Sequence, residues 1–180
     1  LLSIKKVNRV LKKYNLDQVK SSKDLERYGI EYIAPFNILN DKYLENKEIN
    51  FFISTSTFEH IPKKDLELIL IKLRSILLKE SYLSLHIDYS DHFSHGDPSI
   101  GRNNFLKYSE QEFKKFNTWI IYQNRLRHHH YKELFIKSGF QIIEEHAKNF
   151  HELPDKVNYD NLTGNDDDLA TTGRWVLKNI

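Results

Sequence analysis

The sequence predicts an α/β domain built on a mostly parallel sheet. Two apolar segments, residues 49–53 (INFFI) and 82–87 (YLSLHI), have the length and composition of buried strands. Between them, Pro62 precedes residues 63–79, where leucine and isoleucine recur at helical spacing. A strand, a helix and a strand in this order form a crossover unit, so the two strands should be parallel.

The segments before this unit predict further elements. Residues 1–14 predict an amphipathic helix with a basic face, because apolar residues recur among lysines and an arginine. Residues 21–27 predict a short helix capped by Ser21 or Ser22. Residues 30–34 (IEYIA) predict a strand that ends at Pro35, since proline cannot donate to a ladder.

Two helices and two strands are expected after the unit. Ser109 and Glu112 form a capping-box pattern, which predicts a helix up to Phe116. A second helix is expected over 129–137, ended by Gly139. A strand is expected over residues 140–146, and a last strand is expected within residues 169–178.

Composition narrows the class of protein. The chain has 180 residues, which suits one domain, and its formal net charge of +2 disfavours a dedicated nucleic-acid binder. The absence of cysteine excludes disulfides, thiolate zinc sites and a cysteine nucleophile in this sequence. No apolar run approaches the roughly 20 residues of a membrane span, and no signal peptide is recognisable, so a cytoplasmic protein is expected. The sequence begins with Leu1 and contains no methionine, which suggests a fragment.

Four stretches give the chain a resemblance to a known family. They are residues 32–37 (YIAPFN), residues 51–62 (FFISTSTFEHIP), residues 69–79 with their repeated Ile and Leu, and the ending that runs from Leu134 through Ser138-Gly139-Phe140 to Asp168-Leu169-Ala170. Together they resemble the class I S-adenosylmethionine-dependent methyltransferases, in particular the methyltransferase-11-like group. The resemblance implies a Rossmann-like sheet with an antiparallel carboxy-terminal strand, and S-adenosyl-L-methionine as cofactor.

The same resemblance implies where the cofactor would bind. Ala34, Pro35, Phe36 and Asn37 would line the adenine pocket, and Ser54, Thr55 and Ser56 would meet the methionine part. The family's first strand, Gly-rich loop and second strand should precede Leu1, because Gly29 is the only glycine before Gly96. We therefore expect residues 1–180 to form one partial domain, incomplete at its amino-terminal side, that binds the cofactor poorly by itself and is marginally stable.

A loop rich in histidine and aspartate follows the strand at 82–87. His86, Asp88, Asp91, His92 and His95 fall within ten residues. In a methyltransferase this loop would lie over the methyl donor, with Tyr89 and Asp91 contacting the acceptor. His92, together with Asp88, would be catalytic, because an imidazole can take a proton near neutral pH. The same residue types also suit a zinc, iron or manganese site, or purely structural hydrogen bonding.

Residues 122–130 carry a second polar stretch. Asn124 and Arg125 resemble a substrate-side segment of the family, and Arg125 could hold a carboxylate or phosphate or form a surface ion pair. His128, His129 and His130 point in different directions on a helix start, which predicts a solvated run. A last group, Tyr108, Phe113, Phe116 and Trp119, recurs near helical spacing and predicts core rather than a stacking platform.

The expected function is methyl transfer from S-adenosyl-L-methionine to an unidentified acceptor, with a small molecule expected ahead of a nucleic acid and no membrane span. Two alternatives stay open. One is a metal-dependent enzyme that uses the His86–His95 cluster, and the other is a non-catalytic methyltransferase-like interaction domain.

Overall fold

The computed structural model describes residues 3–40 and 42–180. The chain divides into two compact units, Leu1–Asp41 and Lys42–Ile180, and each has its own packing. The expectation of a single partial domain over 1–180 stays a prediction.

The first unit holds a helix and a 3₁₀ turn. Helix α1 spans Ile4–Lys13 and is capped by Ser3, so the helix expected over 1–14 is confirmed apart from residues 1 and 2, which lie outside the described residues. The 3₁₀ helix Lys23–Tyr28 has no side-chain cap from Ser22. Instead, Asp24 Oδ2 accepts from the backbone N–H groups of Lys20 and Ser21 (2.7 and 2.9 Å). Leu11, Val19 and Leu25 form the small core.

The prediction of a strand over residues 30–34 is wrong. The structure has no strand there, and Ile30, Tyr32 and Ile33 are 49%, 39% and 37% exposed. An apolar segment forms a stable strand only where a sheet buries one of its faces. Here that burial is missing, so the apolar pattern produces an irregular segment.

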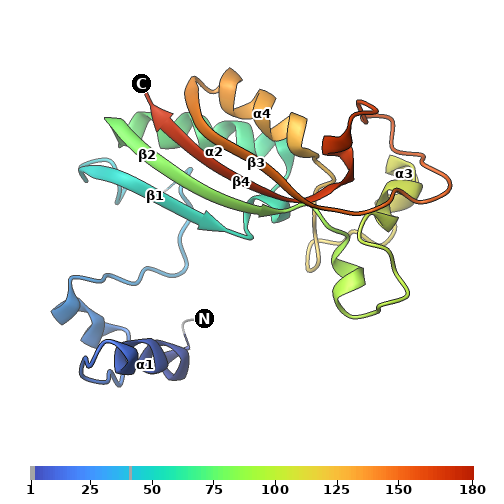
Figure 1. Cartoon of the computed structure of the whole chain (residues 1–180). Coiled ribbons are helices and arrows are strands. Elements are labelled where there is room, and N and C mark those ends of the chain that lie inside the picture. Colours follow the sequence, from blue (N-terminus) through green and yellow to red (C-terminus); the bar gives the residue numbers. More distant parts are fainter. Residues whose placement is uncertain (1–2, 41) are drawn as a thin grey trace. The chain divides into compact units, whose positions relative to one another are not determined.

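The second unit is built on a sheet of four strands (Figure 1). The strands are β1 (Ile49–Thr55), β2 (Leu77–Asp88), β3 (Phe140–Phe150) and β4 (Ala170–Asn179), in the spatial order β1-β2-β4-β3. The β1–β2 pair is parallel, as the crossover predicts. The antiparallel carboxy-terminal strand is also confirmed, because β4 runs against both β2 and β3. This one strand makes two of the three pairings antiparallel, so the described sheet is mixed and not mostly parallel.

Two helices pack on this sheet. Helix α2 (Lys63–Ile76) connects β1 to β2 and buries Leu66, Leu70 and Leu73. It ends three residues before the expected position, and β2 begins at once with Leu77. Asn179, at the end of β4, stabilises this direct junction by donating to the carbonyl oxygen of Leu77 (3.0 Å). Among the described residues, no helix is long and apolar enough to cross a membrane.

Helix α4 (His128–Lys137) begins with the three histidines, and the prediction that they are solvated is wrong. His128 is 1% exposed and stacks on Trp175, with ring centroids 4.2 Å apart. His130 is also buried, and its Nδ1 accepts from the backbone N–H of Arg127 (3.0 Å). The histidines therefore close the helix start and fill the core beside β4.

Residues between β2 and α4 form a lobe without strands. Helix α3 (Glu110–Phe113) has the expected capping box between Ser109 and Glu112, although it ends before Phe116. Phe105, Leu106 and Phe113 of this lobe form a core with Tyr159, which comes from the segment between β3 and β4. Tyr108 and Phe116 pack against this core. Trp119 is 89% exposed, so its predicted place in the core is wrong.

Candidate functional site

The candidate site lies at the carboxyl edge of the parallel β1–β2 pair. Strand β1 ends at Thr55 and leads into a 3₁₀ turn, Phe58–His60. Strand β2 ends at Asp88 and leads into a second 3₁₀ turn, His92–His95. Because the strands are parallel and paired from Ile49 to Thr55, both turns leave the sheet at the same edge. This topology brings residues 59 and 60 next to residue 92.

Glu59 is the most unusual side chain of the site. It is 2% exposed, and neither carboxylate oxygen has a hydrogen-bond partner. Burial is the largest cause and raises the pKa of Glu59 to about 7. The charge of Asp88 adds to this rise, while the backbone N–H groups of Glu59 and Asp88 and the charge of His60 oppose it. A buried carboxylate that is ionised and has no hydrogen-bond partner raises the free energy of the folded state. Binding a proton or a cation would remove this penalty.

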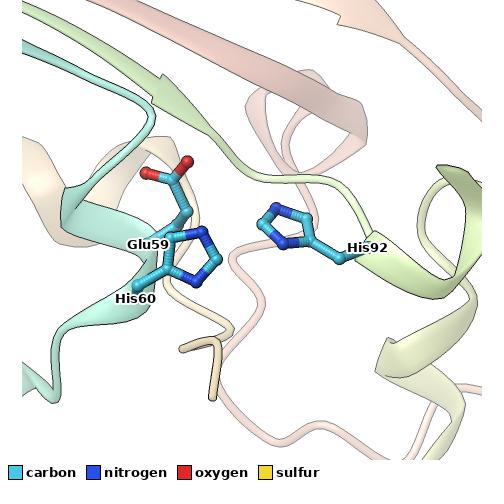
Figure 2. Close-up of side chains that lie close together, drawn as sticks. All are labelled: Glu59, His60 and His92. Atoms are coloured by element: carbon cyan, nitrogen blue, oxygen red, sulfur yellow. The ribbon is translucent and has the colours of Figure 1, made fainter. Parts of the chain in front are cut away.

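His60 and His92 face Glu59 from two different elements. Figure 2 shows the His60 and His92 rings facing each other across a gap, with the Glu59 carboxylate above the His60 ring. The ring centroids lie 4.9 Å apart, and ligand-type atoms of all three residues lie within 4.8 Å of one another. Nδ1 of His60 lies 2.8 Å from the carbonyl oxygen of Tyr122, which can only accept, so Nδ1 carries the proton. His60 therefore has Nε2 available as a lone-pair donor.

Asp88 lies beside His92, as expected for residues that act together. Its Oδ1 accepts from the backbone N–H and the hydroxyl of Ser90 (2.8 and 2.6 Å). Its Oδ2 lies 3.8 Å from Nε2 of His92 and 3.5 Å from Nε2 of His95. Burial lowers the pKa of His92, while the Asp88 carboxylate opposes this shift. His92 is thus mainly neutral at pH 7 and able to accept a proton.

Two other residues expected on the substrate side have internal partners. Tyr89 is buried, and its hydroxyl accepts from Nε1 of Trp175 (2.9 Å). Asp91 is also buried and accepts from the backbone N–H of Phe93 (3.0 Å) and from Nδ2 of Asn104 (3.1 Å). These contacts shape the loop after β2, and a role for either residue with the acceptor stays a prediction.

Asn124 forms hydrogen bonds to the 3₁₀ turn that contains Glu59. Its Nδ2 donates to the carbonyl oxygens of Phe58 (2.9 Å) and Ile61 (2.8 Å). Its backbone N–H donates to the carbonyl oxygen of Glu59 (2.6 Å). These three bonds bracket the turn and fix the direction of the Glu59 side chain. The structure thus gives Asn124 a positioning contact to the site.

Arg125 points away from that turn into the lobe core. It donates to the carbonyl oxygens of Phe105 (3.0 Å) and Tyr108 and to Oε1 of Glu110 (2.6 Å). Of the two interpretations of Arg125, the structure shows an ion pair, in which the arginine side chain is 2% exposed and the Glu110 side chain is 61% exposed. A role for Arg125 with the acceptor stays a prediction.

The expected cofactor residues fall in both units. Ser54, Thr55 and Ser56 end β1, and the backbone N–H of Ser56, at a φ of 47°, donates to the carbonyl oxygen of His86 (2.8 Å). Thr55 and Ser56 are exposed. Residues 34–37 lie in the first unit, where Ala34, Pro35, Phe36 and Asn37 are all exposed.

Sequence reasoning did not identify Glu59 and His60 as site residues. Both were noted only within the Glu-His-Ile-Pro stretch of residues 59–62. A usable signal was present, because a charged pair directly after a parallel strand must lie at the ligand-binding edge of the sheet. Gln123 was also missed, and its Oε1 accepts from the backbone N–H of His92 (3.0 Å).

Comparisons with known proteins identify the fold. No family model matches the sequence, and no curated protein matches it. Among solved structures, a SAM-dependent methyltransferase from Methanosarcina mazei matches with a TM-score of 0.51 and 12% identity, over 81% of this chain and 65% of that one. A SAM-dependent methyltransferase from Archaeoglobus fulgidus matches with a TM-score of 0.50 and 12% identity, over 97% of this chain and 81% of that one.

At this identity the likeness concerns the fold alone. The chain spans less than two thirds of the length of the Methanosarcina protein, and its sheet has the strand order β1-β2-β4-β3. The closer assignment to the methyltransferase-11-like group stays a prediction. The chain has a fold similar to that of S-adenosylmethionine-dependent methyltransferases.

Proposed function

We propose that the protein is an S-adenosyl-L-methionine-dependent methyltransferase whose acceptor, a small molecule, binds at the carboxyl edge of the β1–β2 pair. One observation carries the proposal. In a sheet similar to those of methyltransferases, the loop after β2 presents Asp88 beside a neutral His92 at the edge where open α/β sheets bind ligands.

The residues present fit one side of the cofactor. Thr55, the last residue of β1, and Ser56, directly after it, are exposed, and their hydroxyls suit the polar methionine part. Ser54 precedes them within the strand. Contact of the adenine ring with Ala34, Pro35, Phe36 and Asn37 of the first unit stays a prediction. When bound, S-adenosyl-L-methionine supplies an electrophilic methyl group on a sulfonium.

The chain's own residues contribute alignment and proton transfer. Methyl transfer depends chiefly on holding the acceptor in line with the methyl group, which a rigid strand-end loop can do. His92 takes the acceptor's proton on Nε2, and the Asp88 carboxylate 3.8 Å away stabilises the resulting imidazolium. Both residues follow from β2, so the sheet fixes their spacing.

The test uses the full-length protein and two readouts. Calorimetry with S-adenosylhomocysteine measures cofactor-site binding, and transfer of labelled methyl from S-adenosyl-L-methionine into a small-metabolite extract measures turnover. We expect His92→Gln to retain S-adenosylhomocysteine binding and lose methyl transfer by about a hundredfold, the scale of general-base loss. The matched control is His146→Gln, at an exposed histidine of β3. Absence of S-adenosylhomocysteine binding by the wild type would contradict the proposal.

A further inference from the structure

We propose that Glu59, His60 and His92 bind a divalent first-row transition-metal cation, and that this cation holds oxygen atoms of the methyl acceptor. The second half of this inference rests on the proposed function, whereas the first half does not. The three residues come from two turns that leave neighbouring parallel strands, β1 and β2.

Glu59 provides the main argument for a cation. Its carboxylate is buried, with both oxygens unpartnered, and Nε2 of His92 is likewise buried without a hydrogen-bond partner. Native structures leave few buried polar atoms unsatisfied, so several orphaned atoms facing one gap require an explanation. A cation in the gap would satisfy the carboxylate and the imidazole together.

The surrounding contacts have the form of an outer ligand shell. The Nδ1–H of His60 is held by the carbonyl oxygen of Tyr122 at 2.8 Å, which orients the ring and leaves Nε2 for the ligand bond. The Glu59 turn is fixed by the hydrogen bonds of Asn124. Asp88 Oδ2 lies 3.8 Å from Nε2 of His92 and adds negative charge beside the gap. Metal-binding histidines commonly have such support.

The ligand set selects the class of metal. Two imidazoles and one carboxylate suit zinc, iron(II), cobalt or manganese better than calcium or magnesium, which prefer oxygen ligands. Ligands about 2.1 Å from an ion lie about 3 to 4 Å from one another. The present spread of up to 4.8 Å therefore closes with a small side-chain movement, which the exposed His60 can make.

Three protein ligands leave coordination positions free. Because the site lies beside Asp88, an acceptor with oxygen donors such as hydroxyl and carboxylate groups would be oriented there through the cation. With the cation bound, Nε2 of His92 would be a ligand and would no longer take the acceptor's proton; the cation would instead make a bound hydroxyl group lose its proton more readily. The acceptor class is thus a small molecule with at least two oxygen donors able to chelate.

The experiment measures metal binding without any cofactor. Untagged full-length protein, stripped with chelator, is titrated with Zn²⁺ by calorimetry and with Co²⁺ by visible absorption. We expect one bound ion, and a loss of affinity of about tenfold or more in Glu59→Gln and in His92→Gln. The matched controls Glu144→Gln and His146→Gln alter an exposed Glu–His pair on β3, 3.8 Å apart, and should bind as the wild type does.

Each outcome decides the inference. A wild type that takes up no ion, or Glu59→Gln and His92→Gln variants that bind as tightly as the wild type, would overturn it. Metal-free thermal unfolding shows whether Glu59→Gln is folded, and His60→Gln, at an exposed ring, supplies a second variant if it is not. Zinc binding without S-adenosylhomocysteine binding would support the metal site and overturn the methyltransferase proposal. S-adenosylhomocysteine binding without zinc binding would support the methyltransferase proposal and overturn the metal site.

Discussion

Burial of an ionisable side chain links its protonation to folding, and Glu59 shows this link in the second unit. In the unfolded chain its pKa is near 4.5, whereas in the fold burial raises the pKa to about 7. The folded protein therefore holds a proton that the unfolded chain has already lost over this pH window. Metal-free protein should lose stability as the pH rises through the window, and the loss should level off above about pH 7.

Glu59→Gln tests this link because glutamine does not titrate. The free energy of unfolding of the variant, relative to the wild type, should increase by about 2 to 3 kcal/mol between about pH 5 and about pH 8. The side chains of His60, His92 and Asp88 are ionisable and lie close to Glu59, so the comparison uses the difference in unfolding free energy between the variant and the wild type. Urea unfolding in the presence of chelator provides the measurement.

The control for this measurement is Glu144→Gln, whose carboxylate is exposed on β3. Its stability relative to the wild type should stay nearly constant over the same pH range, because an exposed carboxylate has a similar environment in both states. A flat difference for Glu59→Gln as well would show that the Glu59 pKa is not raised in the fold.

For single residues, the sequence predicted which polar residues would cluster after β2, but not which of their side chains would point into the core. The cluster of His and Asp after β2 was predictable from spacing, and Asp88, His92 and His95 do lie together. Tyr89, one residue beyond the strand, instead reaches Trp175 of β4 in the core. Sequence spacing does not specify which side chain of a strand-end loop turns inward, because that depends on the packing across the sheet.

The loop after β2 packs closely on β4 at Gly173. A Cβ atom at Gly173 would overlap the Tyr89 hydroxyl and would lie 2.8 Å from Nε1 of Trp175. Gly173 pairs with Ile87 of β2 and Ala147 of β3, so the strand cannot shift to make room without breaking both ladders. This glycine therefore permits the Trp175–Tyr89 hydrogen bond.

Gly173→Ala should destabilise the protein by about 3 kcal/mol, because an overpacked core must displace Tyr89 or bend β4. Gly101→Ala is the matched control, since a Cβ there meets nothing within 4 Å. That variant should unfold within about 0.5 kcal/mol of the wild type. Chemical denaturation of both variants gives the comparison, and equal stabilities would contradict the packing argument.

At the element scale, prediction succeeded where the apolar pattern and its burial agreed. The crossover of β1, α2 and β2 followed from local patterns, whereas the antiparallel direction of β4 followed only from the resemblance to methyltransferases. Residues 30–34 carry a similar apolar pattern but are exposed and form no strand, so local preference alone was misleading. His128 and His130 were predicted to be solvated but are buried. Polar residues can fill a core where hydrogen-bond partners are available, such as Glu145 at 3.2 Å from His128.

The second unit has one covered and one uncovered sheet face. Leu83, Leu85 and Ile87 of β2 are buried on one face, together with Trp175 and Leu177 of β4. On the other face, Phe51 and Tyr82 are register partners and are 52% and 40% exposed, and Ile53 is 65% exposed. Strand β1 is also the edge of the four-stranded sheet. Sequence alone showed that β1 was apolar, but not which of its faces would be covered.

An edge strand with an exposed apolar face promotes association between copies of a chain. For the 180-residue chain, we expect sedimentation velocity to show self-association that grows with concentration, and Ile53→Lys to reduce it by placing a charge on the β1 face. Ile71→Lys is the matched control, because Ile71 is a 59% exposed isoleucine on α2, away from the edge strand. If both lysine variants reduced association equally, a general charge effect would explain the result. Association unchanged by Ile53→Lys would exclude the β1 face as the contact.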